Sequence, residues 1–405
     1  MSGTPGWQRM LYILAVAQLL SSVGFSMIFP FLPNYVQELG TASGIGTAFF
    51  IGAVFSAQAV TMAIASPVWG AVADRFGRKP MLVRAMIGAA VVVTLMGFVG
   101  NAEQLVLLRA IQGIVAGTVS AGNALVASIA PRGRTGYAMS LLQTANWGGV
   151  ALGPVMGGIL ADQYGYAQSF VITGILLFIG GLLVVFGVKE TFTPVPRSER
   201  TSILGGWKNL FAKRGMPTTF IARFTSSLGR GLLVPVLPLF VPVLMAGSQG
   251  ISTFTGIVIG VASATGTVSS IVLGSLGDRT GHKRILIVSG VVSAVSYLAM
   301  AFVTEGWQLL VLNALSGIAT GGLLPALSAL IASYADDNEI GSAFGLDNSV
   351  MSAARAVSPL VAVGVAEWLG YPAVFITGSV IFLITVVLSW VRLPEVVPRR
   401  DVVVR

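Results

Sequence analysis

The chain alternates between long apolar runs and short polar segments. Each run holds about 20 residues or more, the length that an α-helix needs to cross the hydrocarbon core of a bilayer. Because lipid offers the backbone no hydrogen-bond partner, such runs are expected to be helices. The pattern predicts twelve of them, at residues 11–35, 46–72, 80–99, 104–129, 137–160, 166–188, 217–245, 252–276, 284–303, 307–333, 341–365 and 370–391.

The runs fall into two similar sets of six. The longest polar stretch separates the sets and mixes Pro, Ser and charged residues, as a linker does. The segment Gly70–Lys79 of the first set recurs as Gly274–Lys283 in the second, and each copy lies between two apolar runs. The repeat predicts an all-α integral membrane protein of twelve transmembrane helices in two pseudo-symmetric six-helix bundles. We expect the bundles at 1–188 and 217–392, the cytoplasmic linker at 189–216 and a cytoplasmic tail at 393–405.

Prolines lie at matching points in the first helix of each set. The first set has Pro30 and Pro33, and the second has Pro235 and Pro238. Because proline interrupts the hydrogen bonds of a helix, both helices are expected to bend. Matching bends would suit two helices that line one central cavity; the alternative is that the prolines are inherited without a present use.

The composition favours a membrane protein. Of the 405 residues, 55% are hydrophobic and 10% charged, and the mean hydropathy is +0.86. Soluble proteins carry roughly 25% charged residues. The absence of cysteine excludes disulfides and Cys-based metal or redox sites, and the single histidine, His282, excludes a His-rich zinc site, so no metal is expected. No cleavable signal peptide is expected, because the first apolar run is too long for one.

The distribution of charge predicts the topology. The net charge is +9, and most Lys and Arg fall in segments that share one side if the N-terminus is cytoplasmic. This positive-inside pattern predicts a multi-pass protein of the inner, cytoplasmic membrane with both termini in the cytoplasm. Because the basic residues are spread over many short loops, the bilayer rather than a nucleic acid is the expected partner. In the loops on the opposite side, the charged residues are all acidic: Glu38, Glu103, Asp162, Glu305 and Glu367.

Three motifs resemble those of the major facilitator superfamily. The first copy of the repeat has the pattern of the signature loop of that family, with Gly70, Asp74, Arg75, Gly77, Arg78 and Lys79. Arg109 with Gln112 and Gly113 is similar to the family's helix-4 arginine motif. The fifth run resembles the antiporter motif of the drug:proton exporter branch, with Gly149, Gly153, Pro154, Gly157 and Gly158.

This resemblance covers the whole chain and implies a transporter rather than an enzyme. It implies export of small amphiphilic compounds, antibiotics included, by proton antiport and alternating access, with no cofactor beyond the proton gradient and with the protein as a monomer. No Walker-type loop is present, so ATP is not expected to be the direct energy source. The alternatives are an exporter or importer of one metabolite, such as a sugar or an organic anion, and a receptor or scaffold that transports nothing.

The cytoplasmic loops suggest a gate. The resemblance implies that Asp74 meets the N-terminus of the eleventh helix, where backbone N–H groups attract an anion. The loop between the fourth and fifth runs is basic, whereas its counterpart in the second set is acidic. We therefore hypothesise a charge lock between the halves, with the loop charges of one half facing opposite charges of the other. Its members are Arg75, Arg78 and Lys79 facing Asp336, Asp337 and Glu339, and Arg132 and Arg134 facing Asp278, next to Arg279 and Lys283.

Charges inside the helices are few and mostly positive. Arg109, Arg223, Arg230 and Arg355 lie within apolar runs, and Asp347 is the one carboxylate placed deep among them. Each intramembrane charge should face a partner or a cavity. Arg223 is expected to reach the cytoplasm along its helix. Proton coupling is assigned to Asp347, with Arg109 tuning a neighbouring acid or water and Asp74 as a second candidate carrier; alternatively, Asp347 only pairs with an intramembrane arginine.

The substrate cavity is expected to have apolar walls with few polar groups, as broad-specificity sites have. Its surplus of arginine disfavours lipophilic cations and should admit neutral, zwitterionic or anionic amphiphiles. Contact with lipid is the alternative for each apolar residue. The expected lining is Phe25, Phe29, Phe31, Gln143, Asn146, Trp147, Arg230 and Arg355.

The charge lock can be tested with pairs of cysteines, one in each of the facing loops. Pairs should crosslink when the outward-open state is populated, because several weak rim pairs together can bias that state. An absence of crosslinks between these loops would contradict the lock.

Overall fold

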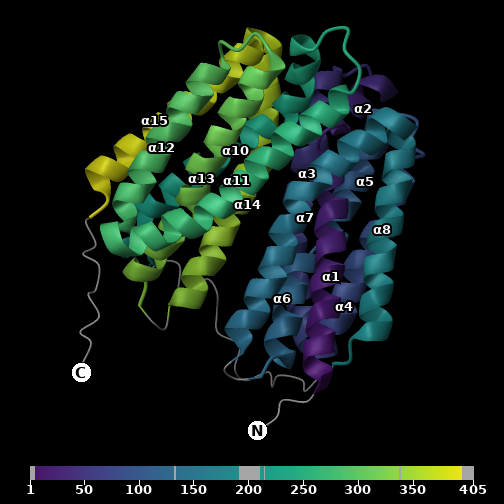
Figure 1. Cartoon of the computed structure of the whole chain (residues 1–405), viewed down its shortest axis with the longest axis vertical. Helices are drawn as coiled ribbons and strands as arrows, with labels where there is room; N and C mark the ends of the chain where they lie inside the picture. The colour runs from purple at the N-terminus through teal and green to yellow at the C-terminus, as the bar shows by residue number, and fades with distance from the viewer. Residues whose placement is uncertain (1–4, 132–133, 191–209, 214, 337–338, 395–405) are drawn as a thin grey trace. The chain divides into compact units, whose positions relative to one another are not determined.

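The computed structural model describes residues 5–131, 134–190, 210–213, 215–336 and 339–394, and all regular structure in these ranges is helical (Figure 1). Each predicted run is helical for most of its length, which confirms the predicted class. The helices of the first half are α1 (Pro5–Met27), α2 (Leu32–Leu39), α3 (Thr47–Phe76), α4 (Arg78–Met96), α5 (Ala102–Val115), α6 (Thr118–Ile129), α7 (Thr135–Tyr164) and α8 (Tyr166–Gly187). Those of the second half are α10 (Met216–Leu244), α11 (Ile251–Thr280), α12 (His282–Met300), α13 (Gly306–Tyr334), α14 (Ile340–Leu369) and α15 (Tyr371–Arg392).

Most of these helices can span a membrane. In the described residues, eleven segments are long and apolar enough to cross one, and α5 and α6 together form one of the eleven. The twelfth predicted span is α7, which has 30 residues but is less apolar because glycines and polar residues interrupt it. Its length still exceeds the roughly 20 residues that a span requires.

The prolines act differently in the two halves. In the first half, α1 ends at Met27 and α2 begins at Leu32, so the predicted bend at Pro30 is a break in the helix. In the second half, α10 continues through Pro235, Pro238 and a third proline, Pro242. The expected symmetry therefore does not extend to matching breaks.

A second break, between α5 and α6, falls inside a predicted run. Gly117 has φ +124°, a conformation that L side chains rarely adopt, and it separates the two helices. The break leaves the Ala116 carbonyl free to accept a hydrogen bond from Arg84 Nη2 at 3.2 Å. The polar backbone freed by the break is thus satisfied by a side chain of α4.

The chain packs as two compact units. The first contains α1–α8, the part of α10 from Val234, the part of α11 through Gly260, and the short segment Pro359–Gly364 of α14. The second contains the remainder of α10, α11 and α14 together with α12, α13 and α15. The first unit is therefore one uninterrupted stretch of chain up to α8, to which parts of later helices are added. The predicted bundle boundaries, 1–188 and 217–392, stay a prediction.

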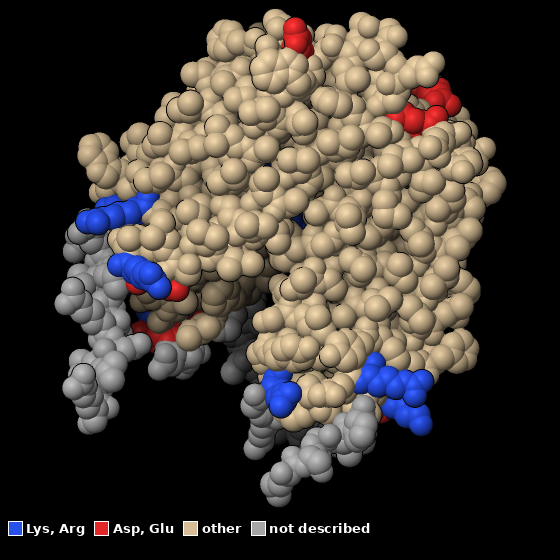
Figure 2. Space-filling model, viewed as in Figure 1, with Lys and Arg blue, Asp and Glu red and all other residues tan. Residues whose placement is uncertain are grey.

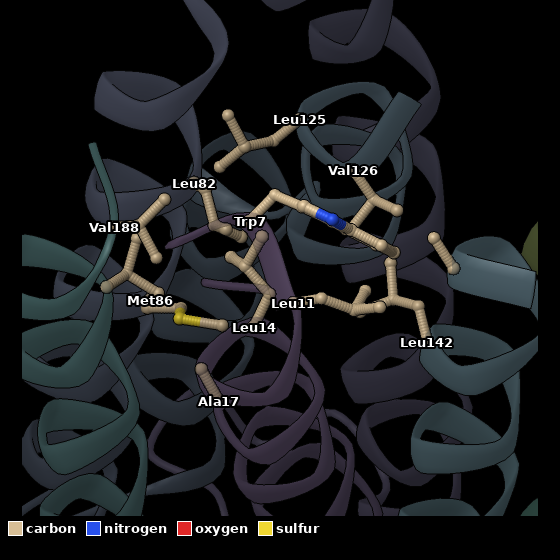
Figure 3. Close-up of a cluster of buried hydrophobic side chains, with 12 residues drawn as sticks. Trp7, Leu11, Leu14, Ala17, Leu82, Met86, Leu125, Val126, Leu142 and Val188 are labelled. Atoms are coloured by element: carbon tan, nitrogen blue, oxygen red, sulfur yellow. The ribbon is translucent and has the colours of Figure 1, made fainter. Parts of the chain in front are cut away.

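The first unit has a core at the beginning of α1. Trp7, Leu11 and Leu14 recur at helical spacing on one face of α1 and are almost fully buried. They contact apolar residues of α4, α6, α7 and α8 (Figure 3). The rest of the cluster is Ala17, Leu82, Met86, Leu125, Val126, Ala138, Leu142, Val184 and Val188. Apolar side chains thus join five helices at this end of the unit.

Glycines of the antiporter motif bring α7 against α1. A methyl group added at Gly157 would lie 1.8 Å from the carbonyl oxygen of Met27, so the backbones are in direct contact. Gly153 and Gly149, one and two turns earlier, meet α1 in the same way. Such glycine stripes allow close helix approach in membranes. The glycines of this motif therefore give α7 a smooth packing face, and its partner is α1.

The same motif also contacts the first turns of α11. Gly158 faces the Ser252 carbonyl oxygen, and Gly256 of α11 faces the Pro154 carbonyl oxygen. Asp162, one turn beyond Gly158, accepts hydrogen bonds from the backbone N–H groups of Ser252 (3.1 Å) and Thr253 (2.7 Å). A carboxylate of α7 therefore caps the N-terminus of α11, where the helix dipole favours negative charge.

Replacing Gly157 with alanine should destabilise the protein, because the added methyl group has no space against Met27. Overpacking of this kind costs about 1–3 kcal/mol or more. The measurement is the apparent melting temperature of the purified protein in detergent. Gly136→Ala in the same helix is the matched control, since no atom lies within 4 Å of the added carbon. Equal melting temperatures for the two variants would contradict the close packing of α7 on α1.

Replacing Asp162 with alanine should lower the melting temperature through the loss of the α11 cap, which is worth about 0.5–2 kcal/mol. Asp162→Asn retains one acceptor oxygen and should have an intermediate effect. The same thermal melts measure both variants. If alanine and asparagine were both as stable as the parent, the hydrogen bonds to Ser252 and Thr253 would not contribute to stability.

Candidate functional site

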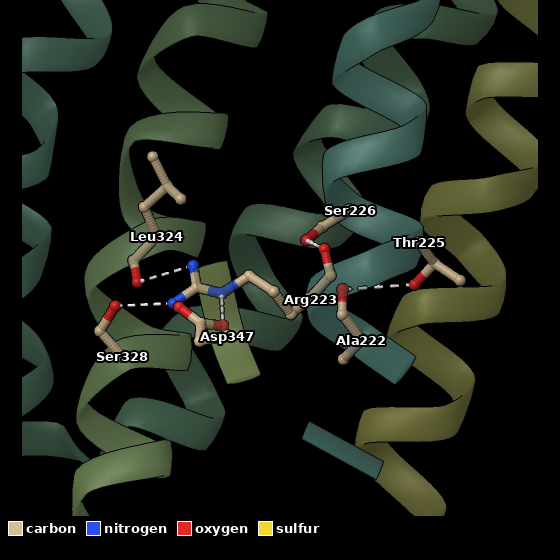
Figure 4. A network of polar contacts seen from close by, with 7 residues as sticks. All are labelled: Ala222, Arg223, Thr225, Ser226, Leu324, Ser328 and Asp347. Atoms are coloured by element: carbon tan, nitrogen blue, oxygen red, sulfur yellow. Dashed lines mark hydrogen bonds and ion pairs between the residues drawn. The ribbon is translucent and has the colours of Figure 1, made fainter. Parts of the chain in front are cut away.

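A buried ion pair links three helices of the second unit (Figure 4). Arg223 of α10 donates from Nε to Asp347 Oδ1 of α14 at 2.6 Å. Its other nitrogens donate to Ser328 Oγ at 2.7 Å and to the Leu324 carbonyl oxygen at 3.3 Å, both in α13. Arg223 is 1% exposed and Asp347 is 4% exposed. The guanidinium thus has partners for all its nitrogens in a place that water does not reach.

This pair corrects one prediction and bears on another. Arg223 was expected to extend toward the cytoplasm, but its guanidinium is buried because Asp347, Ser328 and Leu324 satisfy it within the helices. Asp347 is confirmed as a buried intramembrane carboxylate, and its partner is Arg223. Its role in proton coupling stays a prediction, because pairing and protonation are both available to this carboxylate.

Arg109 lies in the first unit without a carboxylate. Its Nε donates to the Val54 carbonyl oxygen at 2.9 Å, and its Nη1 donates to Gln112 Oε1 at 2.7 Å. The guanidinium also lies 5.8 Å from the centre of the Phe55 ring, within cation–π range. Its Nη2 is buried and has no hydrogen-bond partner among the described residues. The motif residue Gln112 therefore holds Arg109 but does not neutralise it.

Arg230 and Arg355 form a second, unneutralised group in the second unit. Arg230 of α10 is partly buried and Arg355 of α14 is exposed, and both belong to the second unit. In the described part of the chain, neither residue forms an ion pair. The arginine surplus that the sequence predicts for a substrate cavity stays a prediction.

The signature loop forms a tight turn with its own partners. Gly77, at φ +98°, separates α3 from α4, and Gly281, at φ +96°, separates α11 from α12 in the second copy. The backbone N–H groups of Arg78 and Lys79 donate to the carboxylate of Glu190, which caps α4. Both copies of the repeat thus turn at a glycine.

The basic side chains of the first copy are held within the first unit. Arg78 Nη1 donates to the Ala124 carbonyl oxygen at 3.0 Å, and Lys79 Nζ donates to the Val185 carbonyl oxygen at 2.8 Å. Arg75 is exposed, and its guanidinium lies 5.2 Å from the centre of the Phe76 ring. Gly70 lies within α3, and the side chain of Asp74 falls outside the described part of the structure.

The second copy of the loop has different contacts. Asp278 pairs with His282 at 3.2 Å, one turn away in the sequence. Lys283 Nζ donates to the Leu393 carbonyl oxygen at 2.6 Å, and Arg279 is exposed. The two copies share the turn but differ in the groups that hold them.

The acidic loop pairs with a lysine that the sequence reasoning did not single out. Lys213 Nζ lies 2.7 Å from Asp336 Oδ2 and also pairs with Glu339. The hydrogen bond to Asp336, followed by that to Glu339, raises the pKa of Lys213 above its ordinary value. Arg134 is exposed, while Arg132 and Asp337 lie outside the described residues. The charge lock between the halves therefore stays a prediction, and two of its acids already have a basic partner within their own unit.

The expected cavity residues have different environments. Phe31 is fully buried, with its ring 5.5 Å from that of Tyr166 and 5.4 Å from that of Phe170. Phe31 is therefore a core residue here, which corrects the expectation that it lines a cavity. Its position after the break at Pro30 turns the ring toward α8 rather than along α1.

The expected cavity residues of α7 also differ in their environments. Asn146 Oδ1 accepts hydrogen bonds from Ser22 Oγ at 2.7 Å and Gln18 Nε2 at 3.3 Å, so it joins α7 to α1. Gln143 and Trp147, one turn apart, are exposed. Phe25 and Phe29 are partly buried, and the Phe29 ring lies 6.1 Å from that of Phe55. A cavity lined by these exposed and partly buried residues stays a prediction.

Several contacts have no local signal in the sequence. Glu190 and Lys213 lie within the predicted polar linker, 189–216, where charged residues are ordinary. Arg84 places its guanidinium 3.4 Å from the centre of the Trp69 ring, and Trp69 Nε1 donates to the Ile114 carbonyl oxygen at 2.7 Å. The pairing of Arg84 with Trp69 joins α4 to α3 and could be suspected only from the position of Arg84 within an apolar run.

Comparison with known proteins agrees with this architecture. The model of the family described as "Major Facilitator Superfamily" matches residues 14–222 and 219–404 of this chain. Multidrug resistance protein MdtG of Salmonella typhimurium and that of Salmonella arizonae are each 36% identical over 385 residues, which cover 95% of each chain.

Solved structures share the fold at low identity. A bacterial homologue of the human lysosomal transporter Spinster aligns with a TM-score of 0.80 at 12% identity, over 96% of this chain and 97% of its own. The human organic anion transporter MFSD10 (TETRAN) aligns with a TM-score of 0.64 at 20% identity, over 95% and 100%. The chain is a multi-pass, twelve-span membrane protein, and it belongs to the Major Facilitator Superfamily.

Proposed function

We propose that this chain exports small amphiphilic compounds, drugs among them, in exchange for protons. The observation that carries the proposal is the identity of 36% with proteins named multidrug resistance protein MdtG, which extends over 95% of the chain. The similarity therefore includes α10 and α14, which hold the buried ion pair, as well as the glycine motif of α7. Export of chemically diverse compounds agrees with the apolar composition of the helices.

Asp347 is the proposed proton carrier. The carrier must be a group that loses its proton near neutral pH, which arginine cannot do. Asp347 is the one carboxylate that the sequence places deep within an apolar run. Its position 2.6 Å from Arg223 means that protonation would remove the ion pair. Proton binding at this carboxylate thus changes a contact between α10 and α14.

The size of this change suits a conformational switch. Breaking a buried pair so that one charge is left uncompensated costs about 3–5 kcal/mol. States of a transporter that interconvert differ by only a few kcal/mol. When Asp347 is neutral, Arg223 keeps its hydrogen bonds to Ser328 and the Leu324 carbonyl oxygen, so the guanidinium still has polar partners within the unit. Protonation of Asp347 is therefore a contact change large enough to favour one state over another.

The same proposal includes the topology and assembly. We place both termini in the cytoplasm of a bacterial inner membrane, with the protein acting as a monomer. In support, Figure 2 shows a wide surface without charge, and in each unit Lys and Arg gather toward one end of its helices. Such an asymmetry follows the positive-inside rule. The energy source is the proton gradient, and no further cofactor is included.

The proposal is tested by replacing Asp347 with asparagine in proteoliposomes. Transport of a substrate driven by an imposed pH gradient should be lost, while exchange of labelled for unlabelled substrate without a gradient continues. The reason is that asparagine keeps the shape and a hydrogen-bond acceptor for Arg223 but cannot carry a proton. Glu367→Gln, which changes an exposed carboxylate of the same helix, is the matched control and should keep gradient-driven transport.

Two results would contradict the assignment. Gradient-driven transport that survives Asp347→Asn would show that another group carries the proton. Absence of both gradient-driven transport and exchange in the parent protein, across neutral, anionic and cationic amphiphiles, would contradict export itself and favour a receptor or scaffold.

A further inference from the structure

The two arginines that lack an acid, Arg230 and Arg355, occupy defined positions along α10 and α14. Arg223 contacts Asp347, and further along the same helices Gly231 contacts Ser358, where an added methyl group would lie 2.1 Å from Ser358 Oγ. Residue numbers increase together in these two contacts, so α10 and α14 run side by side in the same direction. Arg230 adjoins the Gly231 contact in α10.

Arg223 and Asp347 form a first level of charged residues along α10 and α14. A second level lies further along the same two helices and resembles the first with one change. Arg230 lies about two turns beyond Arg223 on the same face of α10, because seven residues nearly complete two helical turns. Arg355 lies just over two turns beyond Asp347 and one turn before Ser358. At the first level a guanidinium meets a carboxylate. At the second level, the residue seven positions beyond Asp347 is Ala354, and the next residue, Arg355, brings another guanidinium in place of an acid.

Two neighbouring positive charges inside the helices need an anion. Like charges repel more strongly in a medium of low dielectric than in water, and an intramembrane charge is costly without a partner. Asp347 cannot serve, because its Oδ1 is 2.6 Å from Arg223 Nε. Among the described residues, neither Arg230 nor Arg355 has an ion-pair partner. The exposed position of Arg355 leaves its guanidinium accessible to a molecule from outside the protein.

We infer that Arg230 and Arg355 form a binding site for the anionic group, a carboxylate or sulfonate, of a transported amphiphile. Arginine presents a planar fork of donors that matches such oxyanions, and two of them can hold one group from two sides. The inference rests on the proposed export function and specifies its substrate class. The apolar part of the amphiphile would be recognised without directional contacts, whereas its charged group would be recognised by these two residues.

The test uses two fluorescent probes that differ only in charge. Anilinonaphthalene sulfonate and phenylnaphthylamine share one aromatic skeleton, and only the first carries a sulfonate. Each is titrated against the full-length protein in phosphatidylcholine nanodiscs, with the signal of empty nanodiscs subtracted. No proton gradient is needed, so the result does not depend on coupling.

The variants remove the two charges and a control charge. The double variant Arg230→Gln/Arg355→Gln should bind the sulfonate probe about 10-fold more weakly or worse, because charge-assisted hydrogen bonds are lost. Its affinity for the neutral probe should be unchanged, which also reports that the variant is folded. Arg392→Gln, at the exposed end of α15, is the matched control and should leave both affinities unchanged.

Three outcomes would overturn the inference. The first is an equal loss of affinity for both probes in the double variant, and the second is no loss for either. The third is displacement of the sulfonate probe when phosphatidylglycerol is added to the nanodiscs, which would assign the site to a lipid headgroup. Failure of the proposed function is distinct from these, because it would be an absence of transport of the neutral probe by the parent protein.

Discussion

The ion pair between Arg223 and Asp347 is the contact on which the chemistry of this protein depends. It uses the one carboxylate that lies deep in the apolar runs, and it connects α10 to α14, with α13 supplying further oxygen acceptors. A charge in the interior of a membrane protein must have a partner or face water. Asp347 is paired with Arg223, and the other intramembrane arginines form no ion pair within the part of the chain that the structure describes. The charged residues therefore have separate proposed roles. Protonation of Asp347 would break its ion pair with Arg223, whereas Arg230 and Arg355 would attract an anion.

The two halves of the repeat have diverged around this constraint. Both keep the glycine turn of the signature loop, at Gly77 and Gly281. Glycines mediate close packing in both halves: those of α7 bring it against α1 and the first turns of α11, and Gly317 and Gly321 bring α13 against α11. The buried cation of the first half, Arg109, is held by neutral groups. The buried ion pair belongs to the second half. Duplication thus accounts for the shared helical plan, and later divergence accounts for the chemistry.

Sequence patterns were sufficient for the fold because its determinants are local. Apolar length predicts the spans, and the glycine-bracketed charges predict the turns between α3 and α4 and between α11 and α12. Contacts between distant helices were harder to predict. Arg223 and Asp347 are 124 positions apart, and with four arginines available for one acid the pattern did not identify the pair. The break at Gly117 was also missed, because in a chain with 50 glycines one more within an apolar run carries no distinguishing signal.

The most direct measurement of the central claim is a double-mutant cycle on the ion pair. It compares the melting temperatures of the parent, Arg223→Gln, Asp347→Asn and the double variant, each as the purified full-length protein. The account predicts that each single change is strongly destabilising, since a buried charge or its partner is left unpaired, and that the double variant is more stable than the two losses added together, by about 0.5–3 kcal/mol. Additive losses in the double variant would contradict the account, because the two residues would then contribute independently of each other.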